Sequence, residues 1–120
     1  MLDSRDANVL SKFYLSMLGW EIRSDEPGWV TIRPEAGAGY MSFQTNDTYL
    51  PPTWPAGLEH QQMQMHLDIE VRDLAGAVDD AIALGATQAH FQPQDDVRVM
   101  LDPAGHPFCL WLNPNEPQPR

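Results

Sequence analysis

The segment Gln64-Met65-His66-Leu67-Asp68-Ile69-Glu70-Val71 alternates strictly between polar and apolar side chains. A period of two is typical of a β-strand with one packed face and one polar face. The polar face includes His66 and Asp68, so it is the best candidate for chemistry in the chain. The segment is also the first strand in the second copy of an internal repeat. The order of elements in this repeat predicts the architecture of the domain.

The residues that follow predict one helix and three strands. Asp73 can cap the helix, and Leu84-Gly85 ends it. The strands are expected over residues 87–91, 97–101 and 107–112. Between the last two, Asp102-Pro103-Ala104-Gly105 has the residue order that a type I turn prefers. The apolar stripe of the helix is predicted to comprise Leu74, Ala77, Val78, Ala81 and Ile82.

The N-terminal residues show the same order of elements. A short strand over residues 1–3 precedes a helix that Asp6 can cap and Gly19 can end in the left-handed conformation. Strands are then expected over residues 20–24, 29–33 and 39–44. The apolar stripe of this helix is predicted to comprise Val9, Leu10, Phe13, Tyr14, Met17 and Leu18. The pattern predicts one α+β domain over residues 1–120, with βαβββ modules at 1–44 and 63–113 and a polar tail at 114–120.

Residues 45–62 join the two modules and show no periodicity, but they carry several prolines together with Tyr49 and Trp54. A connection this long is unusual in a small domain unless it is a lid or a binding loop. A linker that buries Trp54 against the outside of the sheet explains the same residues equally well. Both interpretations stay open.

The composition excludes several classes of function. The chain has 17 acidic and 7 basic residues and a net charge of -10, so neither nucleic acid nor an anionic membrane surface is an expected partner. Cys109 is the only cysteine, which excludes an intramolecular disulfide and fits a cytoplasmic location. No apolar run approaches the roughly 20 residues that span a bilayer, and the N-terminus lacks a signal-peptide pattern.

Two βαβββ modules, with Met65-His66-Leu67-Asp68 opening the second and Asp102-Pro103-Ala104-Gly105-His106-Pro107-Phe108-Cys109-Leu110 closing it, resemble the vicinal oxygen chelate superfamily. That superfamily holds glyoxalase I, extradiol dioxygenases and bleomycin-resistance proteins. The segment Pro51-Pro52-Thr53-Trp54-Pro55, followed by Gln61-Gln62-Met63, resembles its glyoxalase-like subgroup. The resemblance covers nearly the whole chain. It implies the glyoxalase/bleomycin resistance/dihydroxybiphenyl dioxygenase fold, in which the curved sheets of two modules enclose a cavity.

The resemblance also implies positions for metal ligands. Catalytic members hold a divalent metal with one ligand from the first and last strand of each module. In this chain those positions are Gln44, His66 and Cys109, and the fourth would lie before Met1. Cys109 stands where metal-binding members place a glutamate. The resemblance therefore allows Zn, Ni, Fe or Mn, and a metal-free protein is the alternative.

Strand parity adds residues to the expected cavity. Cys109 shares a face with Trp111, and Gln44 shares a face with Tyr40. The full set expected to line the cavity is His66, Gln44, Tyr40, Trp29, Trp54, Tyr49, Arg98 and Trp111. Arg98 either enters the cavity mouth, where it would pair with an acidic ligand or with Asp68, or forms an ordinary surface ion pair.

Further alternatives concern His66, Cys109 and the short first strand. His66 is either a metal ligand or a hydrogen-bond donor that orients a bound molecule, and Cys109 is either a reactive thiol or a buried, inert one. The short first strand would leave a gap between the modules. Either the chain begins upstream of Met1, or a second copy covers the gap in a homodimer.

Two functions follow from these residues, and they leave open whether the protein is an enzyme. The first is a binding protein that encloses a small aromatic or amphipathic molecule, as antibiotic-sequestering relatives do. The alternative is a divalent-metal-dependent lyase, isomerase or dioxygenase. A purely structural role as a dimer scaffold is the third possibility.

Overall fold

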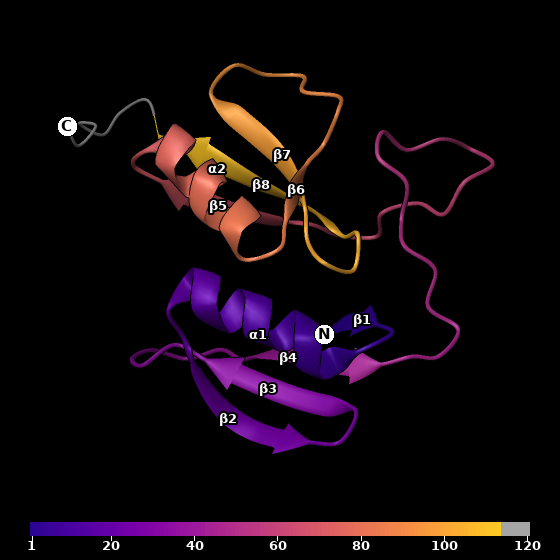
Figure 1. Ribbon diagram of the computed structural model, residues 1–120, viewed down its shortest axis with the longest axis vertical. Helices are drawn as coiled ribbons and strands as arrows, with labels where there is room; N and C mark the ends of the chain where they lie inside the picture. The colour runs from indigo at the N-terminus through magenta and orange to yellow at the C-terminus, as the bar shows by residue number, and fades with distance from the viewer. Residues whose placement is uncertain (114–120) are drawn as a thin grey trace. The chain divides into compact units, whose positions relative to one another are not determined.

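The computed structural model describes residues 1–113 and divides into two compact units, with the boundary between Pro51 and Pro52. Each unit is a βαβββ module whose single helix lies against one face of a four-stranded sheet (Figure 1). The repeated α+β architecture expected from the sequence is thereby confirmed. Within the described residues, no helix is long and apolar enough to cross a membrane.

The first unit contains β1 (Leu2–Ser4), α1 (Ala7–Leu18), β2 (Glu21–Glu26), β3 (Trp29–Arg33) and β4 (Met41–Thr45). Its sheet has the strand order β1-β4-β3-β2. β1 runs parallel to β4, whereas β2, β3 and β4 pair in antiparallel fashion. A parallel pair needs a long crossover, and α1 with its following hairpin provides it.

The second unit repeats this topology with β5 (Leu67–Val71), α2 (Leu74–Ala83), β6 (Thr87–Gln88), β7 (Val97–Leu101) and β8 (Pro107–Leu112). Its strand order is β5-β8-β7-β6, with β5 parallel to β8. The registers also correspond. Leu2 and Asp3 pair with Phe43 and Gln44, as Leu67 and Asp68 pair with Phe108 and Cys109.

The expected caps and turn form as the sequence predicts. The Asp6 carboxylate accepts hydrogen bonds from the backbone N–H groups of Asn8 and Val9, and Gly19 ends α1 with φ of 67°. Asp73 caps α2 by accepting a hydrogen bond from the N–H of Gly76. In the β7–β8 turn, the Gly105 N–H donates to the Asp102 carbonyl at 2.8 Å. These local signals fix the starts of both helices, the end of α1 and the turn between β7 and β8.

Aromatic packing forms the core of the first unit. Tyr14 of α1 stacks on Phe43 of β4, with ring centroids 5.7 Å apart, and both side chains are fully buried. The predicted stripe of α1 was wrong at Val9, which is 55% exposed. Ala7 and Ser11 are buried instead. Burial of the polar Ser11 is possible because its hydroxyl donates a hydrogen bond to the Asn8 carbonyl.

The core of the second unit lies between α2 and β8. Phe108 and Leu110 of β8 are buried, as are Val78 and Ala81 of α2. The predicted stripe of α2 was wrong at Ile82, which is 47% exposed near the end of the helix. The face of each sheet that packs on its helix is called the helix face below, and the opposite one is called the open face.

Five strands differ from the sequence prediction, and the smallest difference is at β1, which covers Leu2–Ser4 instead of residues 1–3. β5 begins at Leu67 instead of residue 64, and its first pair in the β8 register joins Leu67 to Phe108. β2 extends to Glu26, so the turn to β3 is the two-residue segment Pro27-Gly28, with φ of 76° at Gly28. β4 begins at Met41, two residues later than expected.

β6 also differs from the prediction, since it ends at Gln88 instead of residue 91. Beyond that point the Gln92 side chain takes over the pairing with β7. Its Nε2 donates to the carbonyls of Ala89 and Val99, and its Oε1 accepts from the Val99 N–H, each at 2.8 Å. A side-chain amide thus replaces a backbone peptide at the edge of the sheet.

Candidate functional site

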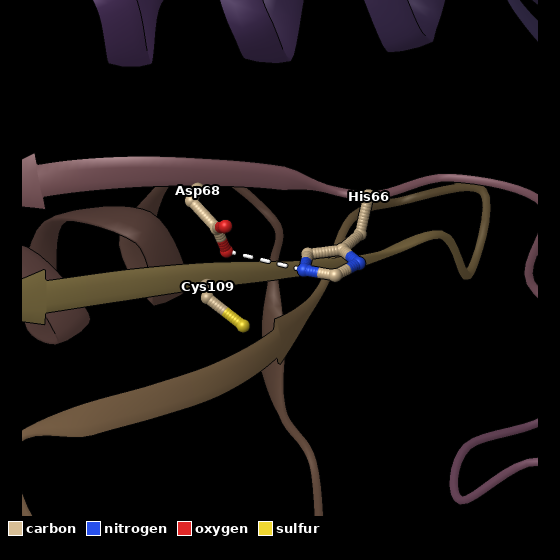
Figure 2. Close-up of side chains that lie close together, drawn as sticks. All are labelled: His66, Asp68 and Cys109. Carbon is tan, nitrogen blue, oxygen red and sulfur yellow. Dashed lines mark ion pairs between the residues drawn. The ribbon is translucent and has the colours of Figure 1, made fainter.

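His66, Asp68 and Cys109 form a cluster on the second unit. Their possible ligand atoms, an imidazole nitrogen, a carboxylate oxygen and the thiol sulfur, all lie within 4.8 Å of one another. His66 Nε2 lies 3.2 Å from Asp68 Oδ1. Figure 2 shows the three side chains converging, with the His66–Asp68 contact drawn as a dashed line.

The strand pairing explains why these residues meet. Asp68 of β5 stands directly beside Cys109 of β8 in the parallel register, so both side chains project from the open face. His66 precedes β5 by one residue and keeps the parity of Asp68. The side chains of His66 and Asp68 are 38% and 62% exposed, and Cys109 is half-buried. The cluster is therefore accessible from solvent.

The electrostatics of the cluster keep Cys109 protonated. Burial raises the pKa of its thiol, and the negative charge of Asp68 and a hydrogen bond to that carboxylate raise the pKa further. The neutral thiol is a weak nucleophile, because reactivity depends on the thiolate. The raised pKa therefore favours the inert thiol of the two alternatives for Cys109 when no cation is bound at the cluster.

The donor set of the cluster fits a divalent metal. Imidazole, carboxylate and thiolate are the three side-chain groups that bind zinc, and catalytic zinc sites use three protein ligands with one open position. Ligand atoms a few ångströms apart can converge on one ion, and the 4.8 Å limit and the 3.2 Å contact satisfy this condition. The presence of a thiol favours zinc over magnesium, calcium or manganese.

Gln44, the remaining predicted ligand, lies on the open face of the first unit. Its Nε2 donates to Asp3 Oδ1 at 3.3 Å, and Asn46 Nδ2 donates to Asp3 Oδ2 at 3.1 Å. Trp29 stands opposite Gln44 across β3 and β4 and is 37% exposed. Within the first unit, the structure brings together Gln44 and Trp29 of the expected cavity residues.

The other aromatic residues expected in the cavity have separate surroundings. Tyr40 precedes β4 and lies under the Arg23 guanidinium, 4.4 Å from ring centroid to Cζ. Tyr49 is buried in the first unit, where its N–H donates to the Asn46 carbonyl. In the second unit, Trp54 packs on Phe91 and donates from Nε1 to its carbonyl at 3.1 Å.

Arg98 does not pair with Asp68, which corrects one of the two expectations for this residue. Arg98 stands opposite Leu110 on the helix face, whereas Asp68 and Cys109 share the open face. Its Nη1 donates to the carbonyls of Gln94, Asp95 and Val97. Trp111, in contrast, shares the open face with Cys109 and is half-buried.

Asp68 is the member of the cluster that the ligand prediction omitted. Two signals in the sequence could have found it. Asp68 follows His66 by two residues, so both project from the same side of a strand. In addition, the first and last strands of a βαβββ module pair in parallel, which brings residue 68 beside residue 109.

Comparison with known proteins gives a family and a fold. Residues 1–111 match the model of a family described as a glyoxalase-like domain. No curated protein sequence matches the chain significantly. Among solved structures, a glyoxalase/bleomycin resistance protein/dioxygenase family enzyme from Burkholderia phytofirmans PsJN is similar, with a TM-score of 0.64 and 20% identity over 92% of this chain and 93% of that one.

Two further structures are similar to the chain. A glyoxalase-related enzyme from Fulvimarina pelagi has a TM-score of 0.66 and 17% identity, over 97% of this chain and 86% of its own. A lactoylglutathione lyase from Agrobacterium tumefaciens has a TM-score of 0.56 and 19% identity, over 93% and 89% respectively. At these identities the likeness establishes the fold, and the chemistry has to be argued from the residues.

Proposed function

The chain belongs to the glyoxalase-like domain family within the vicinal oxygen chelate superfamily, and on that basis we propose that it binds a divalent metal, with zinc preferred, through His66, Asp68 and Cys109. The observation that carries this proposal is the convergence of the three donor atoms within 4.8 Å. The predicted ligands Gln44, His66 and Cys109 include no carboxylate, and Asp68 supplies one. Its anionic oxygen supports metal binding over the metal-free alternative.

Each residue of the cluster has a distinct part in this proposal. The imidazole of His66 would coordinate through one nitrogen, and Asp68 would contribute one oxygen while its other oxygen remains available. Cys109 would bind as a thiolate, so metal binding releases its proton. A metal held there would supply Lewis-acid polarisation to an oxygen atom of a small substrate. A fourth ligand from Gln44 stays a prediction from the family resemblance.

The proposal is tested with the full chain by titration with Zn²⁺ and, separately, with Co²⁺. A cobalt–thiolate charge-transfer band in the ultraviolet would report coordination by Cys109 directly. We expect one ion per chain, and we expect His66→Ala, Asp68→Ala and Cys109→Ser each to weaken binding by at least about tenfold, since even outer-shell partners of metal ligands contribute that much.

His90→Ala is the matched control, because His90 is an exposed histidine of the same unit and lies outside the cluster. It should leave metal affinity unchanged. Absence of stoichiometric binding by the unaltered chain, or equal losses in His90→Ala and His66→Ala, would overturn the proposal. Circular dichroism of each variant confirms that a loss of binding does not arise from unfolding.

A second candidate is metal-free binding of a small aromatic or amphipathic molecule. Two features favour it: the raised pKa of Cys109, which favours its neutral form, and the half-buried Trp111 on the same open face. Trp29 and Gln44 offer a similar aromatic and polar pair on the first unit. Indole and amide groups of this kind are typical of small-molecule sites.

This candidate is tested by tryptophan fluorescence and thermal stability across a panel of metabolites and antibiotics, in the presence of a chelator. A ligand that raises the melting temperature without metal would support it. A response that requires added zinc would instead assign the binding to the metal-dependent function. The predicted homodimer is checked separately by sedimentation equilibrium.

A further inference from the structure

A groove lies on the helix face of the second unit, away from the His66–Asp68–Cys109 cluster. It has a volume of about 380 Å³ and is lined by Leu74, Ala75, Val78, Asp79, Gln88 and Arg98. This volume falls within the range of about 300–1,000 Å³ that is typical of small-molecule sites. The open-face cluster and this groove lie on opposite sides of one sheet, because Arg98 pairs with Leu110 and Cys109 pairs with Val99.

The groove combines an apolar floor with two opposite charges. Leu74, Ala75 and Val78 come from the first turns of α2, and Asp79 follows on the same helix. Arg98 comes from β7. Among the described residues, no ion pair joins Arg98 to Asp79, although both line the groove. Opposite charges in one small groove that do not neutralise each other can each bind a ligand group of the opposite sign.

The guanidinium of Arg98 is held in place before any ligand binds. Its Nη1 donates to three carbonyls of the preceding segment, those of Gln94, Asp95 and Val97, at 3.3, 3.0 and 2.8 Å. All three bonds use Nη1, so within the described residues Nε and Nη2 have no hydrogen-bond partner. A fixed guanidinium with two adjacent donors matches the geometry of a carboxylate.

We propose that this groove binds a small zwitterion with an apolar body, such as an aliphatic or aromatic α-amino acid. The carboxylate of the ligand would meet Arg98, its ammonium group would meet Asp79, and its side chain would cover Leu74, Ala75 and Val78. A purely anionic ligand would meet the repulsion of Asp79, and a purely cationic one that of Arg98. The pair of charges therefore selects a molecule that carries both.

The test is an NMR titration of the full chain with L-phenylalanine, which follows backbone amide shifts at α2 and β7. Two analogues isolate each charge: 2-phenylethylamine lacks the carboxylate, and 3-phenylpropanoate lacks the ammonium group. We expect saturable shifts at Ala75, Val78 and Asp79 with the amino acid. Both analogues should bind at least about threefold more weakly, since exposed charge contacts contribute modestly.

Two variants, Asp79→Asn and Ala75→Trp, test the site without disturbing the Arg98 contacts, and Asp80→Asn is the control. Asp79→Asn should weaken L-phenylalanine binding by about threefold to tenfold, whereas Asp80→Asn, which changes the adjacent exposed residue, should not. Ala75→Trp should abolish binding by filling the groove. The proposal is overturned if no shifts occur up to the solubility limit, if 2-phenylethylamine binds as well as L-phenylalanine, or if Asp80→Asn and Asp79→Asn have equal effects.

Discussion

Asp68 and Cys109 stand side by side in the parallel register of β5 and β8, and the carboxylate raises the pKa of the thiol. Burial is the largest cause of the raised pKa, and the charge of Asp68 adds to it. The relationship is local to one unit and follows from the strand pairing alone. It leads to two predictions that need no metal.

Asp68→Asn should make Cys109 more reactive. The variant removes the negative charge that opposes thiolate formation, so the pKa of Cys109 falls, although burial still raises it. In the presence of a chelator, alkylation by iodoacetamide at pH 8 should be at least about twofold faster than in the unaltered chain. Asp80→Asn serves as control, and an unchanged alkylation rate in Asp68→Asn would contradict the assignment of Asp68 as a cause.

Cys109 should also make the fold sensitive to alkaline pH. A thiol pKa that is higher in the folded state stabilises the fold fully below the unfolded value of about 8.5. This contribution is lost as the pH rises through the folded value. Denaturant unfolding between pH 7 and pH 11 should therefore show a steeper alkaline decline for the unaltered chain than for Cys109→Ser. Parallel curves for the two proteins would refute this linkage.

Gln92→Ala should destabilise the second unit. The substitution removes three hydrogen bonds to backbone groups and leaves the N–H of the buried Val99 without its partner. A buried unsatisfied donor costs about 1–3 kcal/mol, and the free energy of unfolding should fall by that amount. Gln94→Ala, at an exposed position nearby, is the control. Urea denaturation that gives equal stability for the two variants would argue against this role of Gln92.

Asp6→Ala should destabilise the first unit through loss of a helix cap. The carboxylate accepts from two N–H groups at the start of α1, and such caps contribute about 0.5–2 kcal/mol. Lys12→Ala alters an exposed residue of the same helix and should have little effect. Thermal unfolding monitored by circular dichroism compares the two, and a melting temperature for Asp6→Ala no lower than that of Lys12→Ala would contradict the capping role.

The sequence predicted most of the fold because its signals are local. Asp6 and Asp73 mark the helix starts, and β3, β7 and β8 have the bounds that their alternation predicts. The end of β6 was not predictable from strand propensity. It depends on hydrogen bonds from the Gln92 side chain to the backbone of Val99, seven residues further along the chain. The alternation of apolar and polar residues gives no indication of such a contact.

The candidate site was predicted in part for a related reason. His66 and Cys109 were found through family positions, and the structure brings them together. Asp68 entered the prediction only as one possible partner of Arg98, because the sequence alone does not specify which faces of β5 and β7 coincide. Strand pairing decides this, and it places the two side chains on opposite faces of the sheet.

The matching registers of the two modules place an aspartate at equivalent positions in different surroundings. Asp3 of β1 occupies the position of Asp68 in β5, but both of its oxygens accept hydrogen bonds from the amides of Gln44 and Asn46. Asp3 thus ties β1 to the end of β4, whereas Asp68 faces solvent beside a thiol and an imidazole. Equivalent positions in the two modules thus differ in their surroundings, since Asp3 is hydrogen-bonded between strands and Asp68 is exposed. Changes at Asp68 can alter reactivity at little expense to the architecture, while the same changes at Asp3 would loosen the strands it joins.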